Sequence, residues 1–212
     1  MSKLLKVGVL ISGRGSNLEA LARSCAHEAF PAYISCVISN NATARGLSVA
    51  QSYNIKSYVV STKPLDAERV SFILQEHQVD LVCLAGFMSI LPEKFIEDWN
   101  HRIINIHPSL LPSFKGLNAQ KQAFLAGVKI AGCTVHYVYP ELDAGPIIMQ
   151  AAVPVLCSDT VNSLSERILA AEHKCYSEAV RLIAHERVKI DADGVVHCPH
   201  NDRLFMLSDA VQ

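Results

Sequence analysis

The feature that most constrains the fold is an alternation of short, β-branched apolar segments with longer helical patterns. The expected strands are residues 6–11, 33–39, 57–60, 81–84, 103–106, 130–137 and 147–153. The expected helices are residues 17–28, 43–53, 65–77, 119–126 and 160–186. Strands that are apolar on both faces and separated by helices predict an α/β fold with a doubly wound, mostly parallel sheet and helices on both faces. Beyond about residue 119 strands follow one another directly, which indicates an antiparallel C-terminal edge.

Length and composition favour one domain over residues 1–212. No internal repeat, low-complexity tract or flexible linker interrupts the sequence, and half of its residues are hydrophobic. The tail, at about residues 188–205, contains Asp193-Gly194, a dipeptide typical of a hairpin turn. The net charge of −1 predicts no general attraction to nucleic acid or to an anionic membrane. We therefore expect small-molecule partners, held by local sites.

The cysteines and the apolar runs indicate a cytoplasmic protein. The seven cysteines are scattered and odd in number, which suits a reducing compartment better than a disulfide framework. The N-terminal apolar run leads directly into a glycine-rich turn, so we interpret it as a buried strand and not as a signal peptide. No apolar stretch approaches the ~18–20 residues that are needed to span a bilayer.

A glycine-rich turn follows the first expected strand, with the sequence Ile-Ser-Gly-Arg-Gly-Ser-Asn-Leu at residues 11–18. Glycines allow a tight turn, and the N–H groups at the start of the next helix can bind an anion. A dinucleotide site would need a third glycine and an acidic residue ending the second strand, and both are missing. We expect a phosphate site formed by backbone N–H groups, the Ser16 hydroxyl and the Asn17 amide. The alternative is that Ser16 and Glu19 merely form a capping box.

Two polar side chains come together where the strand at residues 103–106 ends. Strand periodicity places Asn105 and His107 on one face, and Pro108 ends the strand. Ligands of open α/β sheets bind beyond the carboxyl ends of the strands. An amide NH₂ and an imidazolium N–H at one point would stabilise a carbonyl oxygen that gains charge during acyl transfer. The alternative is a structural histidine, which is the more common role of a lone histidine.

Asp143 and Glu172 are the two acidic candidates. Asp143 lies in a tight Asp-Ala-Gly-Pro turn, where it either organises the turn or, if it is close to His107, stabilises the protonated imidazole and accepts a proton from an attacking amine. Glu172 takes one place in the apolar stripe of the last long helix. A carboxylate there is costly unless it is paired, so Glu172 either lines a ligand site or forms a buried structural pair.

A metal site is the weaker interpretation of His197, Cys198 and His200. These three potential ligands have no matching cluster elsewhere in the sequence, whereas zinc sites combine two such groups. We expect a surface hairpin and no metal.

Five segments together resemble the folate-dependent formyltransferases. They are ISGRGSNLEAL at residues 11–21, LAGFMSIL at 84–91, INIHPSLLP at 104–112, GCTVHYVYPELDAGPI at 132–147 and AAEH at 170–173. The second to fourth resemble the wider family, which includes methionyl-tRNA formyltransferase and formyltetrahydrofolate hydrolase. The first, with its Gly-Ser-Asn, is similar to the phosphoribosylglycinamide formyltransferases in particular.

The resemblance implies a reaction and a set of residue roles. The reaction is transfer of the formyl group of 10-formyltetrahydrofolate, a co-substrate, to the amine of N1-(5-phospho-D-ribosyl)glycinamide in purine biosynthesis. Catalysis is implied for Asn105, His107 and Asp143. Ribonucleotide binding is implied for the N-terminal half, which holds the phosphate, and for Glu172; the residues are Gly15, Ser16, Asn17 and Glu172. Folate binding, assigned mainly to the C-terminal half, is implied for Lys63, Met88, Ser89, Ile90, Leu91, Asn105, Tyr139, Pro140, Glu141, Leu142 and Asp143. Relatives often have an arginine where this chain has Ser89.

Two other classes of function remain open. A formyltetrahydrofolate hydrolase or a methionyl-tRNA formyltransferase is expected to carry an extra regulatory or basic domain, for which this sequence has no segment. A non-catalytic nucleotide-binding module would have no use for Asn105, His107 and Asp143 together. Both a monomer and a weak homodimer are compatible with the sequence.

Overall fold

The computed structural model describes residues 3–60, 64–191, 193–198 and 205–207. The chain divides into two compact units, Met1–Asn105 and Ile106–Gln212. That both units belong to one formyltransferase domain stays a prediction. Within the described ranges, no helix is both long enough and apolar enough to cross a membrane.

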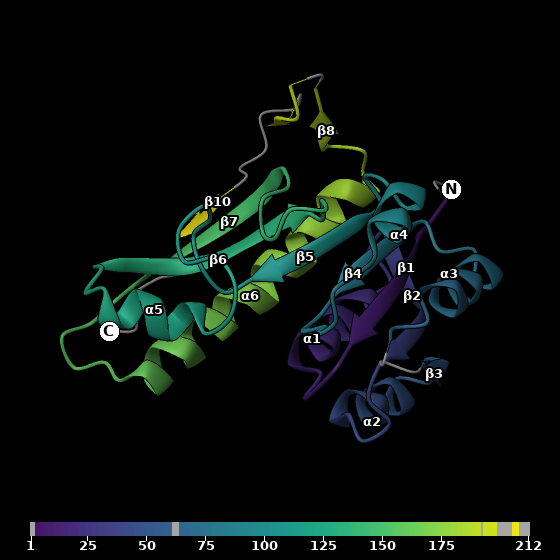
Figure 1. The fold of residues 1–212 in the computed structure, drawn as a ribbon, viewed down its shortest axis with the longest axis horizontal. Helices are drawn as coiled ribbons and strands as arrows, with labels where there is room; N and C mark the ends of the chain where they lie inside the picture. Colours follow the sequence, from purple (N-terminus) through teal and green to yellow (C-terminus); the bar gives the residue numbers. More distant parts are fainter. Residues whose placement is uncertain (1–2, 61–63, 192, 199–204, 208–212) are drawn as a thin grey trace. The chain divides into compact units, whose positions relative to one another are not determined.

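The first unit contains parallel strands. Its strands β1 (Leu5–Ile11), β2 (Ala32–Ser39), β3 (Ser57–Val59) and β4 (Leu81–Leu84) lie in the order β4-β1-β2-β3. Every neighbouring pair is parallel, and β5 (Ile103–His107) runs parallel to β4 through its first three residues (Figure 1). Parallel strands share one carboxyl edge, so the turns after β1 and β4 lie at the same edge of this unit.

Helices cover both faces of these strands. The helices of the unit are α1 (Ser16–Cys25), α2 (Arg45–Ser52), α3 (Ala67–Glu76) and α4 (Glu93–Asp98). A Cβ placed on Gly8 of β1 would lie 2.5 Å from Leu74 of α3, and one on Gly46 of α2 would lie 2.5 Å from Ile11 of β1. Gly8 and Ile11 are an odd number of residues apart, so α3 and α2 pack on opposite faces. The predicted α/β class with a mostly parallel, doubly covered sheet is confirmed.

The second unit contains the antiparallel edge. Strands β6 (Ile130–Tyr137) and β7 (Ile147–Pro154) pair antiparallel, as the sequence predicts. Helices α5 (Ala119–Leu125) and α6 (Val161–Ala184) pack together, and α6 runs along β6 and β7 (Figure 1). A capping box between Thr160 and Ser163 fixes the start of α6.

The tail corrects one expectation. The predicted hairpin exists as β8 (Lys189–Ile190) and β9 (Val196–His197), which pair antiparallel around Gly194 with a φ of 77°. Phe205, however, does not end this hairpin, because it begins β10 (Phe205–Leu207), which lies parallel to β7. Neither β10 nor the short helix α4 is among the elements predicted from sequence. Both are too short to show a periodic pattern of their own.

Candidate active site

A buried pair of side chains forms the centre of the site in the second unit. His107 is the last residue of β5 and is 5% exposed. Its Nδ1 lies 3.3 Å from Oδ2 of Asp143, whose side chain is 7% exposed. Asn105 precedes His107 by two residues in β5, so strand periodicity places both on the same face of that strand. The structure thus brings His107 and Asp143 together, which the sequence left open.

Local backbone geometry positions Asp143 between β6 and β7. Asp143 has a φ of 48°, in the left-handed region that aspartate tolerates better than most residues. Two residues later, a Cβ on Gly145 would lie 1.9 Å from the carbonyl oxygen of Tyr137, so only glycine fits there. The two interpretations of Asp143 are therefore compatible: it shapes the turn, and its carboxylate reaches His107.

Both ring nitrogens of His107 face hydrogen-bond acceptors. Nε2 lies 2.9 Å from the backbone carbonyl oxygen of Phe114, and Nδ1 faces the Asp143 carboxylate. A carbonyl and a carboxylate can only accept, so each ring N–H of His107 has an acceptor beside it, and a ring that carries both protons donates to both. A protonated imidazole is the type of donor that stabilises negative charge developing on a carbonyl oxygen.

A tight loop runs across this pair. Phe114, Gly116 and Asn118 have positive φ angles of 56°, 77° and 57°. The backbone N–H of Gly116 donates a hydrogen bond of 2.8 Å to Oδ2 of Asp143. The loop therefore contacts both members of the pair. The N–H of Gly116 binds Oδ2 of Asp143, and the carbonyl oxygen of Phe114 lies at Nε2 of His107.

A second buried histidine, His136 of β6, also faces Asp143. His136 is 2% exposed, and its Nε2 lies 3.8 Å from Oδ1 of Asp143. Its Nδ1 lies 2.9 Å from the carbonyl oxygen of Tyr137. Burial lowers the pKa of His136 and outweighs the opposing effects of the Tyr137 carbonyl and the Asp143 charge. His136 is absent from the residues predicted from sequence, although it shares their signal, a histidine near the end of a strand that leads into a turn.

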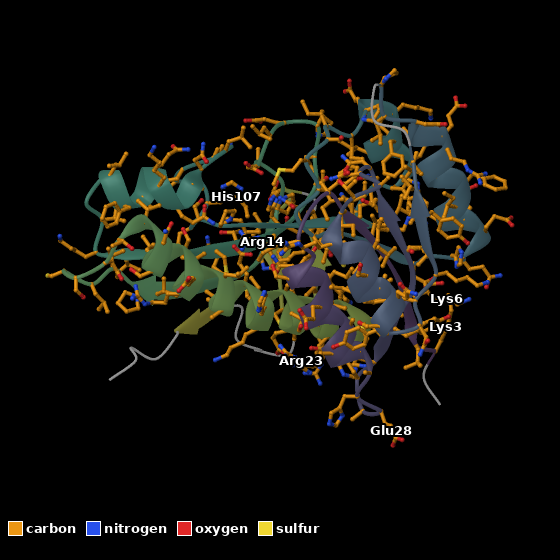
Figure 2. The ribbon with its side chains drawn as sticks, turned by 90° about the horizontal axis from the view of Figure 1, so that it is seen from below. Lys3, Lys6, Arg14, Arg23, Glu28 and His107 are labelled. Atoms are coloured by element: carbon orange, nitrogen blue, oxygen red, sulfur yellow. The ribbon has the colours of Figure 1, made fainter. Side chains whose placement is uncertain are left out.

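The glycine-rich turn in the first unit, which contains Arg14 (labelled in Figure 2), is held by backbone contacts. Gly15 is the N-cap of α1 with a φ of 81°, and a Cβ there would lie 2.5 Å from Cα of Gly46. The N–H of Gly46 donates to the carbonyl oxygen of Gly13 at 3.1 Å. Among the described residues no side chain caps α1, so the capping-box interpretation of Ser16 is wrong. The reason is that the glycine takes the N-cap position and Ser16 is already helical.

The segment after β4 presents apolar side chains to solvent. Met88 is 73% exposed and Ile90 is 91% exposed, whereas Leu91 is buried. The N–H of Met88 donates to Oγ of Ser12 at 2.7 Å, which ties this segment to the glycine-rich turn. Ser89 accepts a hydrogen bond of 2.7 Å from Nδ2 of Asn40.

The comparison with known proteins identifies the family. The model of the Formyl transferase family matches residues 5–180. The chain belongs to the formyltransferase family. A crystal structure of a phosphoribosylglycinamide formyltransferase from Anaplasma phagocytophilum is 68% identical, with a TM-score of 0.94 over 98% of this chain and 100% of that one.

Two further relatives are longer than this formyltransferase chain. The human trifunctional purine biosynthetic protein adenosine-3 is 48% identical over 200 residues, which are 92% of this chain but 20% of that protein. A formyltetrahydrofolate deformylase from Pseudomonas syringae is 33% identical, with a TM-score of 0.86 over 93% of this chain and 66% of that one.

The remaining predicted residues of this formyltransferase lie in three places. Ser16 is half-buried and Asn17 is buried in the first turn of α1, beside Gly15. Glu172 lies on the buried face of α6, as predicted, and is 6% exposed. The residues of the predicted folate turn precede Asp143 and are half-buried or exposed; they are Tyr139, Pro140, Glu141 and Leu142. Lys63 lies outside the described residues.

Glu172 contributes to the raised pKa of a neighbouring buried cysteine. The pKa of Cys133 in β6 is raised, first by a hydrogen bond with Cys175 of α6, then by burial, and to a smaller extent by the charges of Cys175 and Glu172. The carboxylate therefore lies near the interface between α6 and β6. Whether it binds ribonucleotide stays a prediction.

The metal interpretation gains no support in the part of the chain that the structure describes. No group of three or more histidine, cysteine or acidic residues suited to a metal ion occurs there. Nε2 of His197 contacts Oδ2 of Asp191 in the exposed hairpin, and His200 lies outside the described residues.

Proposed function

We propose that this chain transfers the formyl group of 10-formyltetrahydrofolate to the amine of N1-(5-phospho-D-ribosyl)glycinamide, giving the N-formyl product and tetrahydrofolate in purine biosynthesis. The observation that carries the proposal is the buried His107–Asp143 pair at the end of β5. It occurs in a chain that is 68% identical, over 98% of its length, to a phosphoribosylglycinamide formyltransferase.

The proposed chemistry assigns a task to each member of the site. The amide of Asn105 and an N–H of His107 donate hydrogen bonds to the formyl oxygen as it gains negative charge. Asp143 holds the imidazolium and assists transfer of the amine proton, directly or through water, to the folate nitrogen that leaves as tetrahydrofolate. Nε2 of His107 is bonded to the carbonyl of Phe114 in the structure, so this bond is exchanged for one to the formyl oxygen.

The two substrates are assigned to different groups of residues. For the folate we propose the segment Met88, Ser89, Ile90 and Leu91, the turn Tyr139, Pro140, Glu141 and Leu142, and Lys63. Met88 and Ile90 of the first unit have exposed apolar side chains, and so does Leu142 of the second unit; side chains of this kind suit contact with an aromatic pterin. For the ribonucleotide we propose the backbone of Gly15, the side chains of Ser16 and Asn17, and the Glu172 carboxylate. The uncapped start of α1 in the described structure suits a phosphate. No metal takes part in this proposal.

A formyl-transfer assay tests the function against its rivals. Purified protein is given 10-formyltetrahydrofolate with and without N1-(5-phospho-D-ribosyl)glycinamide, and both tetrahydrofolate and formate are measured. The proposal expects tetrahydrofolate release only with the ribonucleotide, in equal amount to the formylated product. Release of formate without ribonucleotide would identify a hydrolase. Formylation of methionyl-tRNA, offered as the acceptor in a parallel assay, would identify the tRNA enzyme. Binding of the ribonucleotide without turnover would identify a non-catalytic module.

We further propose a cytoplasmic location for this chain. Its oligomeric state follows from sedimentation of the purified protein, which distinguishes a monomer from a weak homodimer.

A further inference from the structure

A buried hydroxyl contacts residues 109–111, which lead from His107 toward the loop at residues 114–118, called the covering loop below. Thr134 of β6 is 0% exposed. Its Oγ1 donates a hydrogen bond of 2.7 Å to the carbonyl oxygen of Ser109 and accepts one of 3.0 Å from the N–H of Leu111. It accepts a third bond, of 3.0 Å, from Nε2 of Gln150. A hydroxyl offers one donor and two acceptor sites, so Thr134 uses its full capacity here.

Gln150 completes the arrangement from the neighbouring strand. Gln150 of β7 is the direct cross-strand partner of Thr134. Its Nε2 also donates to the carbonyl oxygen of Leu111 at 3.0 Å. Two side chains thus bind three backbone groups of residues 109–111, which lie outside any helix or strand. Buried backbone groups without such partners are costly, so these bonds hold the segment against β6 and β7.

Close packing against β6 also holds residues 109–111 in place. A Cβ on Gly132 of β6 would lie 2.9 Å from Cδ2 of Leu110 and 2.0 Å from the carbonyl oxygen of Ala151. Glycine at this position therefore lets Leu110 approach the strand. Oγ of Ser109 donates to the carbonyl oxygen of Ser113, which closes the turn.

The segment connects two groups of the candidate active site. Residues 109–111 follow directly after His107 and Pro108, and residues 112–113 lead from them to Phe114, whose carbonyl contacts Nε2 of His107. We propose that Thr134 and Gln150 are positioning residues for the formyl transfer, an inference that rests on the proposed function. By holding residues 109–111, they keep His107 in place relative to Asp143 and to the covering loop, and they act without contacting substrate.

The proposal predicts that loss of these hydrogen bonds lowers kcat strongly and changes the KM for the ribonucleotide little. The proposed phosphate site lies in residues 13–17, far from Thr134 along the chain, and keeps its own contacts. Without the hydrogen bonds of Thr134 or Gln150, by contrast, His107 loses its fixed position. A displacement of about 1 Å at a catalytic group can cost ~10²-fold in rate.

Kinetics on four variants test this role. Thr134→Val keeps the shape and removes the hydroxyl, so we expect kcat to fall by about tenfold or more, with the ribonucleotide KM changing by roughly twofold at most. Thr134→Ser keeps the hydroxyl and should stay within roughly twofold of the natural protein. Val135→Ala, at a buried neighbour in β6, lowers the melting temperature and should keep kcat. If Thr134→Val does not fold, Gln150→Met is used, with a loss of kcat in the same direction.

Two results would overturn the positioning role. One is a kcat of Thr134→Val close to that of the natural protein well below its melting temperature. The other is an equal loss in Val135→Ala, which would show a general effect of destabilisation. Amide hydrogen exchange at Leu111 gives a readout independent of activity, and it should accelerate in Thr134→Val but not in Thr134→Ser. If the natural protein shows slow amide exchange at Leu111 but no formyl transfer, the proposed function is refuted, whereas the hydrogen bonds of Thr134 to residues 109–111 are supported.

Discussion

The glycine-rich turn and the His107–Asp143 site are built in opposite ways. The turn is a continuous stretch, residues 13–17, and the groups it offers to a ligand are mainly backbone N–H groups at the start of α1. The site in the second unit combines side chains from β5, from β6 and from the turn before β7. A backbone site depends on local dihedral angles, whereas a side-chain site depends on how distant segments pack.

The largest expected effect is on catalysis at His107, in contrast to the substrate binding proposed for the glycine-rich turn. His107→Asn should keep the fold and lower kcat by roughly 10²-fold or more, a loss of about 2.7 kcal/mol or above in transition-state stabilisation. Substrate binding should change much less, because the charge exists mainly in the transition state. Steady-state kinetics and a melting curve on the same variant check this.

Asp143→Asn provides the companion measurement. It should also lower kcat, and the two losses should be less than additive because both residues serve the same charge. A histidine with a purely structural role gives a different pattern: His107→Asn would melt at a lower temperature with near-normal turnover in the folded fraction. That pattern would remove the catalytic role.

The second effect concerns the backbone of the turn. Gly15→Ala places a side chain at a φ of 81°, with its Cβ 2.5 Å from Cα of Gly46. The left-handed conformation alone costs about 1–2 kcal/mol, so we expect at least that loss in the free energy of unfolding, measured in urea. Gly13→Ala is the matched control, because its Cβ meets no atom within 4 Å. Equal losses in both variants would contradict the role of the close contact with Gly46.

The third effect concerns what the turn binds. Ser16→Ala combined with Asn17→Ala should raise KM for the ribonucleotide by about tenfold, equivalent to ~1.4 kcal/mol, and leave KM for the folate nearly unchanged. Both side chains belong to the proposed phosphate site, and neither is assigned to the folate. A similar rise in both KM values, or none in either, would show that the phosphate binds elsewhere.

The smallest effect is a pH dependence in the second unit. Burial lowers the pKa of His136 below its usual 6.5, so below about pH 6.5 the unfolded chain takes up a proton that folded His136 does not. This group therefore lowers stability as the pH falls, and its cost is absent above that pH. His136→Gln should make the melting temperature fall less between about pH 7 and pH 5. His27→Gln, which changes an exposed histidine in the same way, is the matched control. The same slope in His136→Gln and the natural protein would contradict the prediction.

Features fixed within a few residues could be predicted from the sequence. The alternation of strands and helices, the end of β5 before Pro108, the tight turn at Gly15 and the buried place of Glu172 all follow from local pattern, and the structure has each of them. The helix start at Ser16 was the exception, because Gly15 and Ser16 both suit an N-cap and only the close contact with Gly46 fixes the conformation of Gly15.

The sequence by itself determined the fold class, the strand that carries Asn105 and His107, and the glycine turn, because period-2 and helical patterns are properties of adjacent residues. Tertiary structure alone decided that Asp143 lies beside His107, that His136 joins them and that the backbone of Gly116 reaches the carboxylate. These contacts depend on the register of β6 against β7 and on the positive φ angles of the loop. Distances between residues so far apart in the chain are set by packing, which no local pattern encodes.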